Sequence, residues 1–308
     1  MKIALFCATH RGYLCYQKLV SLEPKAEYIV CTFNPESFEP DFLFEIKGFT
    51  DFHKHELLVW DPKSSKKSSQ AWSDKSFDLL FTINWRYRIP AEIYLKAGLG
   101  AFVFHDSLLP EYRGFSPTVW AIVNGEDHTG VSLFKIAEEI DSGDLVDQKK
   151  ISIGPNEMID SVMKKVTQGY VDILEGNLPK ILAKNLKLHP QDQSKATFTC
   201  KRLLGDNKIQ WNHSSKAIFN LIRGVSHPYP GAYCFLQGKK LTIWSAEISQ
   251  KPKEFVGSIP GRVVEIIKDK GIVVLTGDGS LLVKTVQLEN RNETCSAELI
   301  SNLSTTLE

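Results

Sequence analysis

The first half of the chain alternates short apolar runs with segments of helical spacing. Residues 2–8 and 27–33 are apolar runs typical of buried strands, and residues 12–22 between them have the spacing of a helix. A further buried strand is expected at 77–84. Strands that alternate with helices predict an α/β fold with a Rossmann-like, doubly wound and mostly parallel sheet.

The pattern changes in the second half. A long amphipathic helix is expected at 156–182, and the polar stretch that follows has no strong periodicity. After a helix at 214–223, short strands alternate with turns such as Gln237-Gly238, as in a small β-barrel. The expected strands are 233–236, 240–248, 261–267, 271–275 and 281–288. The expected organisation is a first domain over 1–186, a linker over 187–200 and a second domain over 201–308.

Composition narrows the class of protein. The 308 residues are 43% hydrophobic, and 37 Lys and Arg against 36 Asp and Glu leave a formal net charge of +1. This balance gives no overall electrostatic reason to expect a nucleic acid partner. The first eight residues are too short for a secretory signal, and no apolar run approaches the roughly 20 residues of a membrane span. The expected location is the cytoplasm.

Several kinds of site are disfavoured by what the sequence lacks. The six cysteines are scattered without a Cys-x-x-Cys pair, so we expect neither a metal site nor a disulfide framework. The loop expected at 9–12 lacks the glycines of a dinucleotide-binding turn, and no P-loop motif occurs. Dinucleotide-binding and P-loop functions therefore lose support.

One histidine stands at the end of a predicted strand. Three apolar residues precede His105, and a second strand at 129–135 runs on to the glycine-containing loop Asp141-Ser142-Gly143-Asp144. A histidine and a carboxylate brought together in this way could transfer protons. The alternative is that His105 is an ordinary residue at a strand end.

An ordered set of short motifs accompanies these two residues. It comprises His105-Asp-Ser-Leu-Leu-Pro-Glu-Tyr-Arg-Gly-Phe-Ser-Pro117, Asn124-Gly-Glu126, Thr129-Gly-Val131, Ile140-Asp-Ser-Gly-Asp144, Gln191-Asp-Gln-Ser-Lys-Ala-Thr197 and His227-Pro-Tyr-Pro-Gly-Ala-Tyr233. Together these motifs resemble the folate-dependent formyltransferases, which include methionyl-tRNA, glycinamide ribonucleotide and nucleotide-sugar formyltransferases. The resemblance covers nearly the whole chain and implies an OB-like β-barrel as the second domain.

The resemblance implies a catalytic site with one departure. The family usually has an Asn-x-His sequence at this strand end, and here Val103 takes the place of the asparagine beside His105 and Asp141. Valine can neither donate nor accept a hydrogen bond. Asn84 could fill the role from the neighbouring strand end, or His105 and a backbone N–H could suffice. Otherwise the chain is a binding protein without catalysis.

The resemblance also implies 10-formyltetrahydrofolate as the formyl donor. The residues that it assigns to the donor are Asn84, Trp85, Arg86, Tyr87, Ile136, Ile140 and Asp141. Those considered for the acceptor are His10, Ser107 and Arg113. Alternatives stay open: Trp85 and Tyr87 as packing residues, His10 as a plain loop residue, and Arg113 in an ion pair with Glu111.

The acceptor is suggested by the charge of residues 34–61. Methionyl-tRNA formyltransferases usually insert a basic loop in this region to hold the tRNA, and here carboxylates outnumber lysines. The carboxylates are Glu36, Glu39, Asp41, Glu45, Asp51, Glu56 and Asp61, against Lys47 and Lys54. This charge disfavours tRNA, and the resemblance then implies a nucleotide-linked amino sugar as acceptor, in cell-surface polysaccharide biosynthesis, with a homo-oligomer possible.

Overall fold

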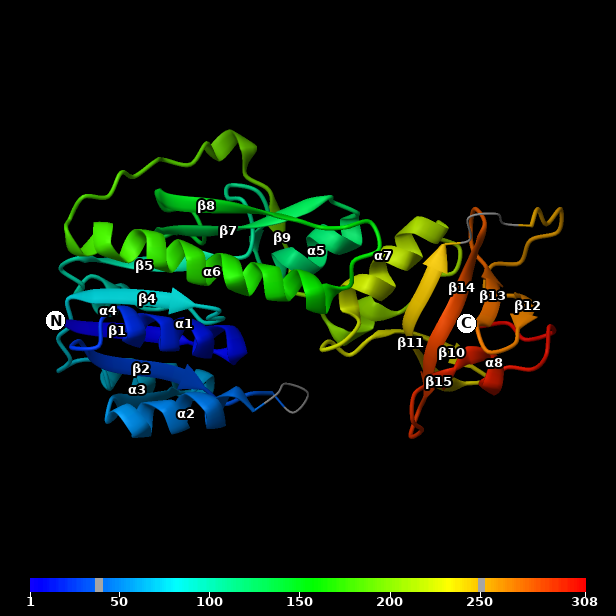
Figure 1. Ribbon diagram of the computed structural model, residues 1–308, viewed down its shortest axis with the longest axis horizontal. Coiled ribbons are helices and arrows are strands. Elements are labelled where there is room, and N and C mark those ends of the chain that lie inside the picture. Colours follow the sequence, from blue (N-terminus) through cyan, green and yellow to red (C-terminus); the bar gives the residue numbers. More distant parts are fainter. Residues whose placement is uncertain (37–40, 249–252) are drawn as a thin grey trace. The chain divides into compact units, whose positions relative to one another are not determined.

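A seven-stranded sheet is the framework of the first of two units in the chain (Figure 1). The structure is a computed structural model and describes residues 1–36, 41–248 and 253–308. The strand order is β3-β2-β1-β4-β5-β7-β8, with parallel pairing from β3 through β5 and antiparallel pairing of β5 with β7. The predicted doubly wound, mostly parallel sheet is therefore confirmed.

The first unit comprises residues 1–114, 129–151 and 164–199. Its strands are β1 (Lys2–Cys7), β2 (Glu27–Phe33), β3 (Glu56–Trp60), β4 (Leu79–Ile83), β5 (Gly100–His105), β6 (Arg113–Gly114), β7 (His128–Lys135), β8 (Leu145–Ser152) and β9 (Phe198–Thr199). Its helices are α1 (Thr9–Leu22), α2 (Phe42–His53), α3 (Ser65–Gln70), α4 (Ala91–Tyr94) and most of α6 (Ile159–Leu182), with short 3-10 helices at Pro62–Ser64 and Gln193–Lys195.

Two segments differ from their sequence interpretation. The acidic stretch 34–61, interpreted only by its charge, contains α2 and β3. The stretch 64–75, whose polar and lysine-rich composition predicts an exposed helix or loop, contains the buried Trp72, whose ring stacks on Phe6 with 4.6 Å between ring centroids. One large aromatic side chain packed on a central strand outweighs the polar character of its neighbours.

The second unit comprises residues 115–128, 152–163 and 200–308 and carries an antiparallel sheet of order β10-β11-β14-β13-β12, with β15 on β14. The predicted second β domain is thus confirmed. At the expected turn, Gln237 and Gly238 have φ values of 50° and 75°, as a tight hairpin requires. The elements are α5 (Pro117–Asn124), a 3-10 helix (Leu204–Asn207), α7 (Ser215–Val225), β10 (Ala232–Leu236), β11 (Lys239–Ile248), β12 (Val263–Ile267), β13 (Gly271–Leu275), β14 (Ser280–Leu288), β15 (Thr294–Cys295) and α8 (Ser296–Leu299).

The second unit takes in two segments that the sequence analysis assigned to 1–186. Helix α5 packs on α7 so closely that a Cβ at Gly224 would lie 3.1 Å from a methyl carbon of Val123. The buried Arg223 donates to the carbonyls of Gly154 and Glu157 at 3.3 and 3.1 Å. These long-range contacts, which periodicity does not register, join both segments to the second unit.

In the part of the chain that the structure describes, no helix is both long and apolar enough to cross a membrane.

Candidate active site

His105 is the last residue of β5 and is only 8% exposed. Its Nε2 lies 2.8 Å from the carbonyl oxygen of Tyr112. Because a carbonyl oxygen only accepts hydrogen bonds, Nε2 carries the proton in this contact, and Nδ1 of the neutral ring keeps its lone pair. Nδ1 faces Asp141, whose Oδ2 is 3.6 Å away. The structure therefore brings the two residues together, with Nδ1 of His105 on the side of the ring that faces the Asp141 carboxylate.

The Asp141 side chain is held by the backbone of a neighbouring loop. Asp141 has a φ of 54°, and its Oδ2 accepts a hydrogen bond of 2.9 Å from the N–H of Gly114. Gln191 fixes the backbone of the same loop, because its Nε2 donates to the carbonyls of Asp141 and Gly143 at 2.9 and 2.7 Å. The carboxylate is thus oriented toward His105 by contacts from two other segments.

Gln191 lies in the stretch expected to be a linker, and the sequence analysis gave it no role beyond its motif. Its Oε1 accepts from Nη2 of Arg113 at 2.6 Å, while Nη1 of Arg113 donates to Gln193 at 2.8 Å. Nothing in the polar pattern of 187–200 could reveal these contacts, since they join residues about eighty positions apart.

Arg113 and Ser107, the two residues considered for the acceptor after β5, both have partners within the chain. Arg113 is 3% exposed, and its guanidinium donates to the two glutamines and not to Glu111. The Ser107 hydroxyl is buried and donates to the carbonyl of Glu111 at 2.6 Å. Both side chains hold the loop after β5 in shape, so this geometry does not support direct acceptor binding by either.

Asp106 faces the opposite side of β5 from His105, as strand alternation predicts. Its two carboxylate oxygens lie 2.7 and 2.6 Å from Nη1 of the buried Arg11, and the hydroxyl of Tyr170 also donates to it. Burial acts to raise the pKa of Asp106, but the charge of Arg11 and these hydrogen bonds hold it below the ordinary value. The side chains of Asp106, Arg11 and Tyr170 thus link the end of β5 to α1 and α6, and they stabilise the packing of these elements.

Val103 lies two residues before His105 on the same face of β5 and is half-buried. Its partner in the register with β4 is Thr82. Thr82 is 6% exposed, and its hydroxyl has no hydrogen-bond partner among the residues that the structure describes. Asn84, the side chain expected to replace the missing amide, instead donates from Nδ2 to Thr9 Oγ1 at 2.7 Å.

The loop after β4 is partly a packing element. Trp85 meets Phe6, Phe33 and Trp60 edge to face at centroid distances of 5.1, 5.2 and 6.0 Å, which supports the packing interpretation. Nη1 of the next residue, Arg86, donates to Glu36 at 3.1 Å.

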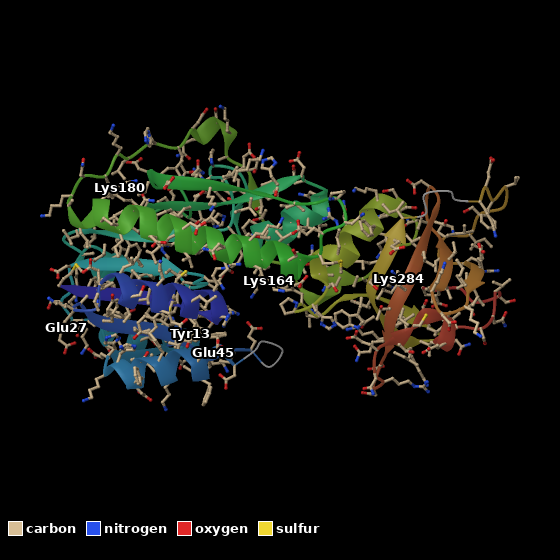
Figure 2. The ribbon with its side chains drawn as sticks, in the orientation of Figure 1. Tyr13, Glu27, Glu45, Lys164, Lys180 and Lys284 are labelled. Atoms are coloured by element: carbon tan, nitrogen blue, oxygen red, sulfur yellow. The ribbon has the colours of Figure 1, made fainter. Side chains whose placement is uncertain are left out.

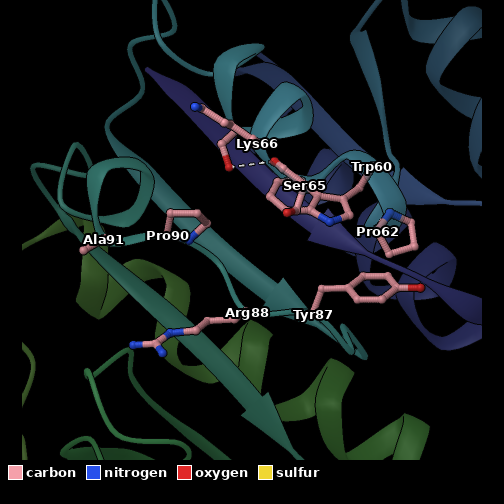
Figure 3. Close-up of a pocket in the computed structure, with 9 residues that line it drawn as sticks. Trp60, Pro62, Ser65, Lys66, Tyr87, Arg88, Pro90 and Ala91 are labelled. Atoms are coloured by element: carbon pink, nitrogen blue, oxygen red, sulfur yellow. Dashed lines mark hydrogen bonds between the residues drawn. The ribbon is translucent and has the colours of Figure 1, made fainter.

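Tyr87 lines a cavity of about 510 Å³ together with Trp60, Lys66, Arg88 and Pro90 (Figure 3). The residues that line this cavity belong to the end of β3, to the segment that leads into α3, to α3 itself and to the segment from β4 to the start of α4, and His105 and Asp141 are not among them. Of the other residues expected near the donor, Ile136 is half-buried and Ile140 is 70% exposed.

His10 lies in the first turn of α1, not in the expected loop, because the helix begins at Thr9. Its Nδ1 is 3.1 Å from Oε2 of Glu45 on α2. Figure 2 marks Glu45 and Tyr13 on these two helices. His10 is largely exposed and follows β1, which is separated from β5 by β4. It remains open to a ligand but is not part of the His105–Asp141 pair.

We expect Gly143→Ala to disturb the Asp141 loop. A Cβ at this position would lie 1.8 Å from the carbonyl oxygen of Lys135, so the backbone must move. The expected loss of unfolding free energy is about 1–3 kcal/mol, measured by denaturant unfolding. Gly176→Ala on α6 is the matched control, because nothing lies within 4 Å of its added Cβ and a gain of roughly 0.5–1 kcal/mol is expected. Equal stability of the two variants would contradict this account.

Metal chemistry finds no support in the geometry. Within residues 1–36, 41–248 and 253–308, no group of three or more His, Cys, Asp or Glu side chains could hold a metal ion.

Comparison with known proteins identifies the family. The model of the formyl transferase family matches residues 39–175, and that of the formyl transferase C-terminal domain matches residues 205–303. The methionyl-tRNA formyltransferase of Staphylococcus aureus (strain Newman) is 31% identical over 257 residues, which cover 82% of this chain and 81% of that protein. The bifunctional polymyxin resistance protein ArnA of Wigglesworthia glossinidia brevipalpis is 32% identical over 261 residues. That match covers 84% of this chain but 40% of ArnA.

A solved structure has the same fold. WlaRD, a sugar 3N-formyl transferase crystallised in the presence of dTDP and 5-N-formyl-THF, superimposes with a TM-score of 0.68 at 18% identity, over 95% of this chain and 99% of that one. The matches to both family models and to the full-length relative confirm the resemblance found in the motifs. The chain belongs to the formyl transferase family and is a formyl-transferring enzyme.

Proposed function

We propose that this chain transfers the formyl group of 10-formyltetrahydrofolate to the amine of a nucleotide-linked amino sugar. The observation that carries the proposal is the His105–Asp141 pair, in which Nδ1 of the imidazole lies 3.6 Å from a carboxylate oxygen while Nε2 contacts the Tyr112 carbonyl. An amine that attacks a formyl carbon must lose a proton, and a positioned histidine is the usual base for such a step.

The chain's own groups have distinct tasks in this mechanism. His105 accepts the amine proton at Nδ1 while Nε2 remains bonded to the Tyr112 carbonyl. Asp141 stabilises the imidazolium that forms, and the Gly114 N–H keeps the carboxylate pointed at the ring. Orientation by Asp141 therefore matters as much as basicity at His105.

The residues present fit a folate formyl donor. Val103, two residues before His105 on the same face of β5, is half-buried, and Ile140, next to Asp141 in the chain, exposes an apolar side chain; apolar groups of this kind suit a flat heteroaromatic ring. The buried hydroxyl of Thr82 is a polar atom without a hydrogen-bond partner among the described residues. The donor supplies the formyl carbon when bound. The family relationship, and the likeness of fold to WlaRD, support this choice.

The choice of an amino sugar over tRNA rests on the segment after β2. Residues 34–46 contain no lysine or arginine, so this segment offers no cation to a tRNA backbone. Two of the carboxylates noted there pair with cations of this chain, Glu36 with Arg86 and Glu56 with Lys75, and Glu45 contacts the His10 ring. The negative charge of this surface is thus partly neutralised, while Glu39 lies outside the described residues. The likeness of fold to a sugar 3N-formyl transferase agrees with this choice.

Tetrahydrofolate release from 10-formyltetrahydrofolate, measured with a panel of UDP-, dTDP- and GDP-linked amino sugars and with initiator methionyl-tRNA, tests the proposal. We expect release that depends on one nucleotide-linked amino sugar and changes little with salt. Release that requires methionyl-tRNA and falls steeply between low and moderate salt would replace the sugar by tRNA. Nucleotide sugars without the amine serve as the control for binding without transfer.

A further inference from the structure

We propose that Thr82 is a catalytic residue, whose hydroxyl donates a hydrogen bond to the formyl oxygen in the place left by Val103. The inference rests on the proposed function, since it assigns the vacant oxyanion role at the same site. It concerns a residue on β4 that the sequence patterns did not single out.

The unpartnered hydroxyl of Thr82 is the first observation. Thr82 is more than nine-tenths buried, and its Oγ1 has no hydrogen-bond partner in the described part of the chain. A buried hydroxyl without a partner costs about 1–3 kcal/mol, and such groups in native proteins call for an explanation. A ligand oxygen that arrives during the reaction supplies the missing partner.

The position of Thr82 in the sheet is the second observation. Thr82 pairs with Val103 in the parallel register of β4 and β5, so their side chains stand on the same face about 5 Å apart. His105 is on that face, two residues farther along β5. Thr82 is therefore the β4 neighbour of the side chain that lacks the usual amide.

Two other polar side chains near Thr82 already have hydrogen-bond partners within the chain. Asn84 donates to Thr9, which follows β1, on the side of β4 away from β5. Ser132, the β7 partner of His105, donates to the carbonyl of Ser107 and accepts from Leu109 N–H. The Thr82 hydroxyl has no such hydrogen bond within the described residues, so the choice among its χ1 rotamers is left to a ligand, and a rotamer can direct the donor toward the space beside Val103.

The reaction balances with this assignment. The acceptor nitrogen bonds to the formyl carbon, the bond from that carbon to N10 of the folate breaks, and one proton passes from the amine through His105 to N10. No oxidant or reductant is required. The formyl oxygen carries negative charge only between these two bond changes, and a donor aimed at it then stabilises the transition state more than the ground state.

Thr82→Val is the decisive variant, because it removes the hydroxyl and keeps the shape. We expect kcat for tetrahydrofolate release to fall by about 10²–10³-fold, as when one oxyanion donor is removed, while the variant is at least as stable as the native chain. Thr82→Ser should keep most of the activity. Adding Val103→Asn to Thr82→Val should restore part of the loss.

Thr32→Val is the matched control. Thr32 is on β2, is also buried, and its hydroxyl also lacks a partner among the described residues, but its strand is separated from β5 by β1 and β4. It should gain stability like Thr82→Val without any change in kcat.

An infrared measurement separates this inference from the proposed function. With the donor bound and its formyl group labelled with ¹³C, the carbonyl band should lie at lower frequency in the native chain than in Thr82→Val, whatever the acceptor. An unchanged band, or equal kcat in the two proteins, overturns the role of Thr82. Absence of turnover with every amino sugar, together with a shifted band, overturns the proposed acceptor and leaves Thr82 as the partner of the formyl oxygen.

Discussion

Replacing His105 by Gln is expected to slow formyl transfer by about 10²–10⁴-fold, the usual contribution of a general base. The amide nitrogen of Gln can still donate to the Tyr112 carbonyl, which now accepts from Nε2 at 2.8 Å. What the variant lacks is the basic lone pair of Nδ1 that faces Asp141. The loss should appear in kcat under saturating donor and acceptor, measured as tetrahydrofolate release.

Two further variants test whether the loss of activity is specific to His105 and its carboxylate partner. Asp141→Asn keeps an oxygen for the Gly114 N–H but removes the charge that stabilises the imidazolium, so kcat should fall as well. His213→Gln, a change at an exposed histidine of the second unit, should leave the rate unchanged. If the His105→Gln variant turned over at the native rate, the proton would have to leave by another route and the proposed mechanism would be wrong.

Asp106→Ala is expected to lower the free energy of unfolding by about 3–5 kcal/mol, the largest stability effect that we anticipate. The substitution leaves the guanidinium of Arg11 buried, with its side chain 3% exposed, and without the carboxylate that contacts Nη1 at 2.6 Å. It also removes the acceptor of the Tyr170 hydroxyl, which is itself buried. Denaturant unfolding at neutral pH measures the effect.

The double variant Arg11→Met/Asp106→Ala is the control, because removing both charges leaves no buried ion alone. It should lose less than Asp106→Ala does. A double variant that is destabilised as much as Asp106→Ala would show that packing, and not the stranded charge, causes the loss.

Acid should abolish the contribution of this ion pair. Since the folded state holds the pKa of Asp106 below its ordinary value, the carboxylate stabilises the protein fully only above the unfolded pKa of about 3.9. The contribution is lost as the pH falls from there through the lower folded pKa. The stability difference between the native chain and Asp106→Asn should therefore shrink below about pH 4.

Sequence patterns predict the helices and strands, and they also indicate His105 and Asp141 as candidate site residues. Each of these predictions depends on residues that are close together in the chain. The apolar run before His105 and the glycine-containing loop around Asp141 each reveal a strand end or a turn, and strand alternation alone placed Asp106 on the other face. Trp85 shows the limit of prediction from local patterns. The sequence predicts its position after β4, but its packing against Phe6 and Phe33 depends on strands far apart in the chain.

The contacts that the sequence could not reveal are those set by tertiary pairing. The guanidinium of Arg113 donates to Gln193 and Gln191, two glutamines of a stretch that shows no periodic pattern. Thr82 gains its significance only from the register that pairs it with Val103. Such partners are chosen by strand order and by the path of the chain, and no local period encodes them.

The interleaving of the two units limits how these formyl transferases can exchange parts by recombination. The chain passes from one unit to the other at residues 114/115, 128/129, 151/152, 163/164 and 199/200. A single crossover near residue 200 would join a foreign α7 to the resident α5, and these two helices pack so closely that a Cβ at Gly224 would lie 3.1 Å from a methyl carbon of Val123. Viable chimaeras should therefore co-inherit α5, the 152–163 segment and the C-terminal sheet as one set.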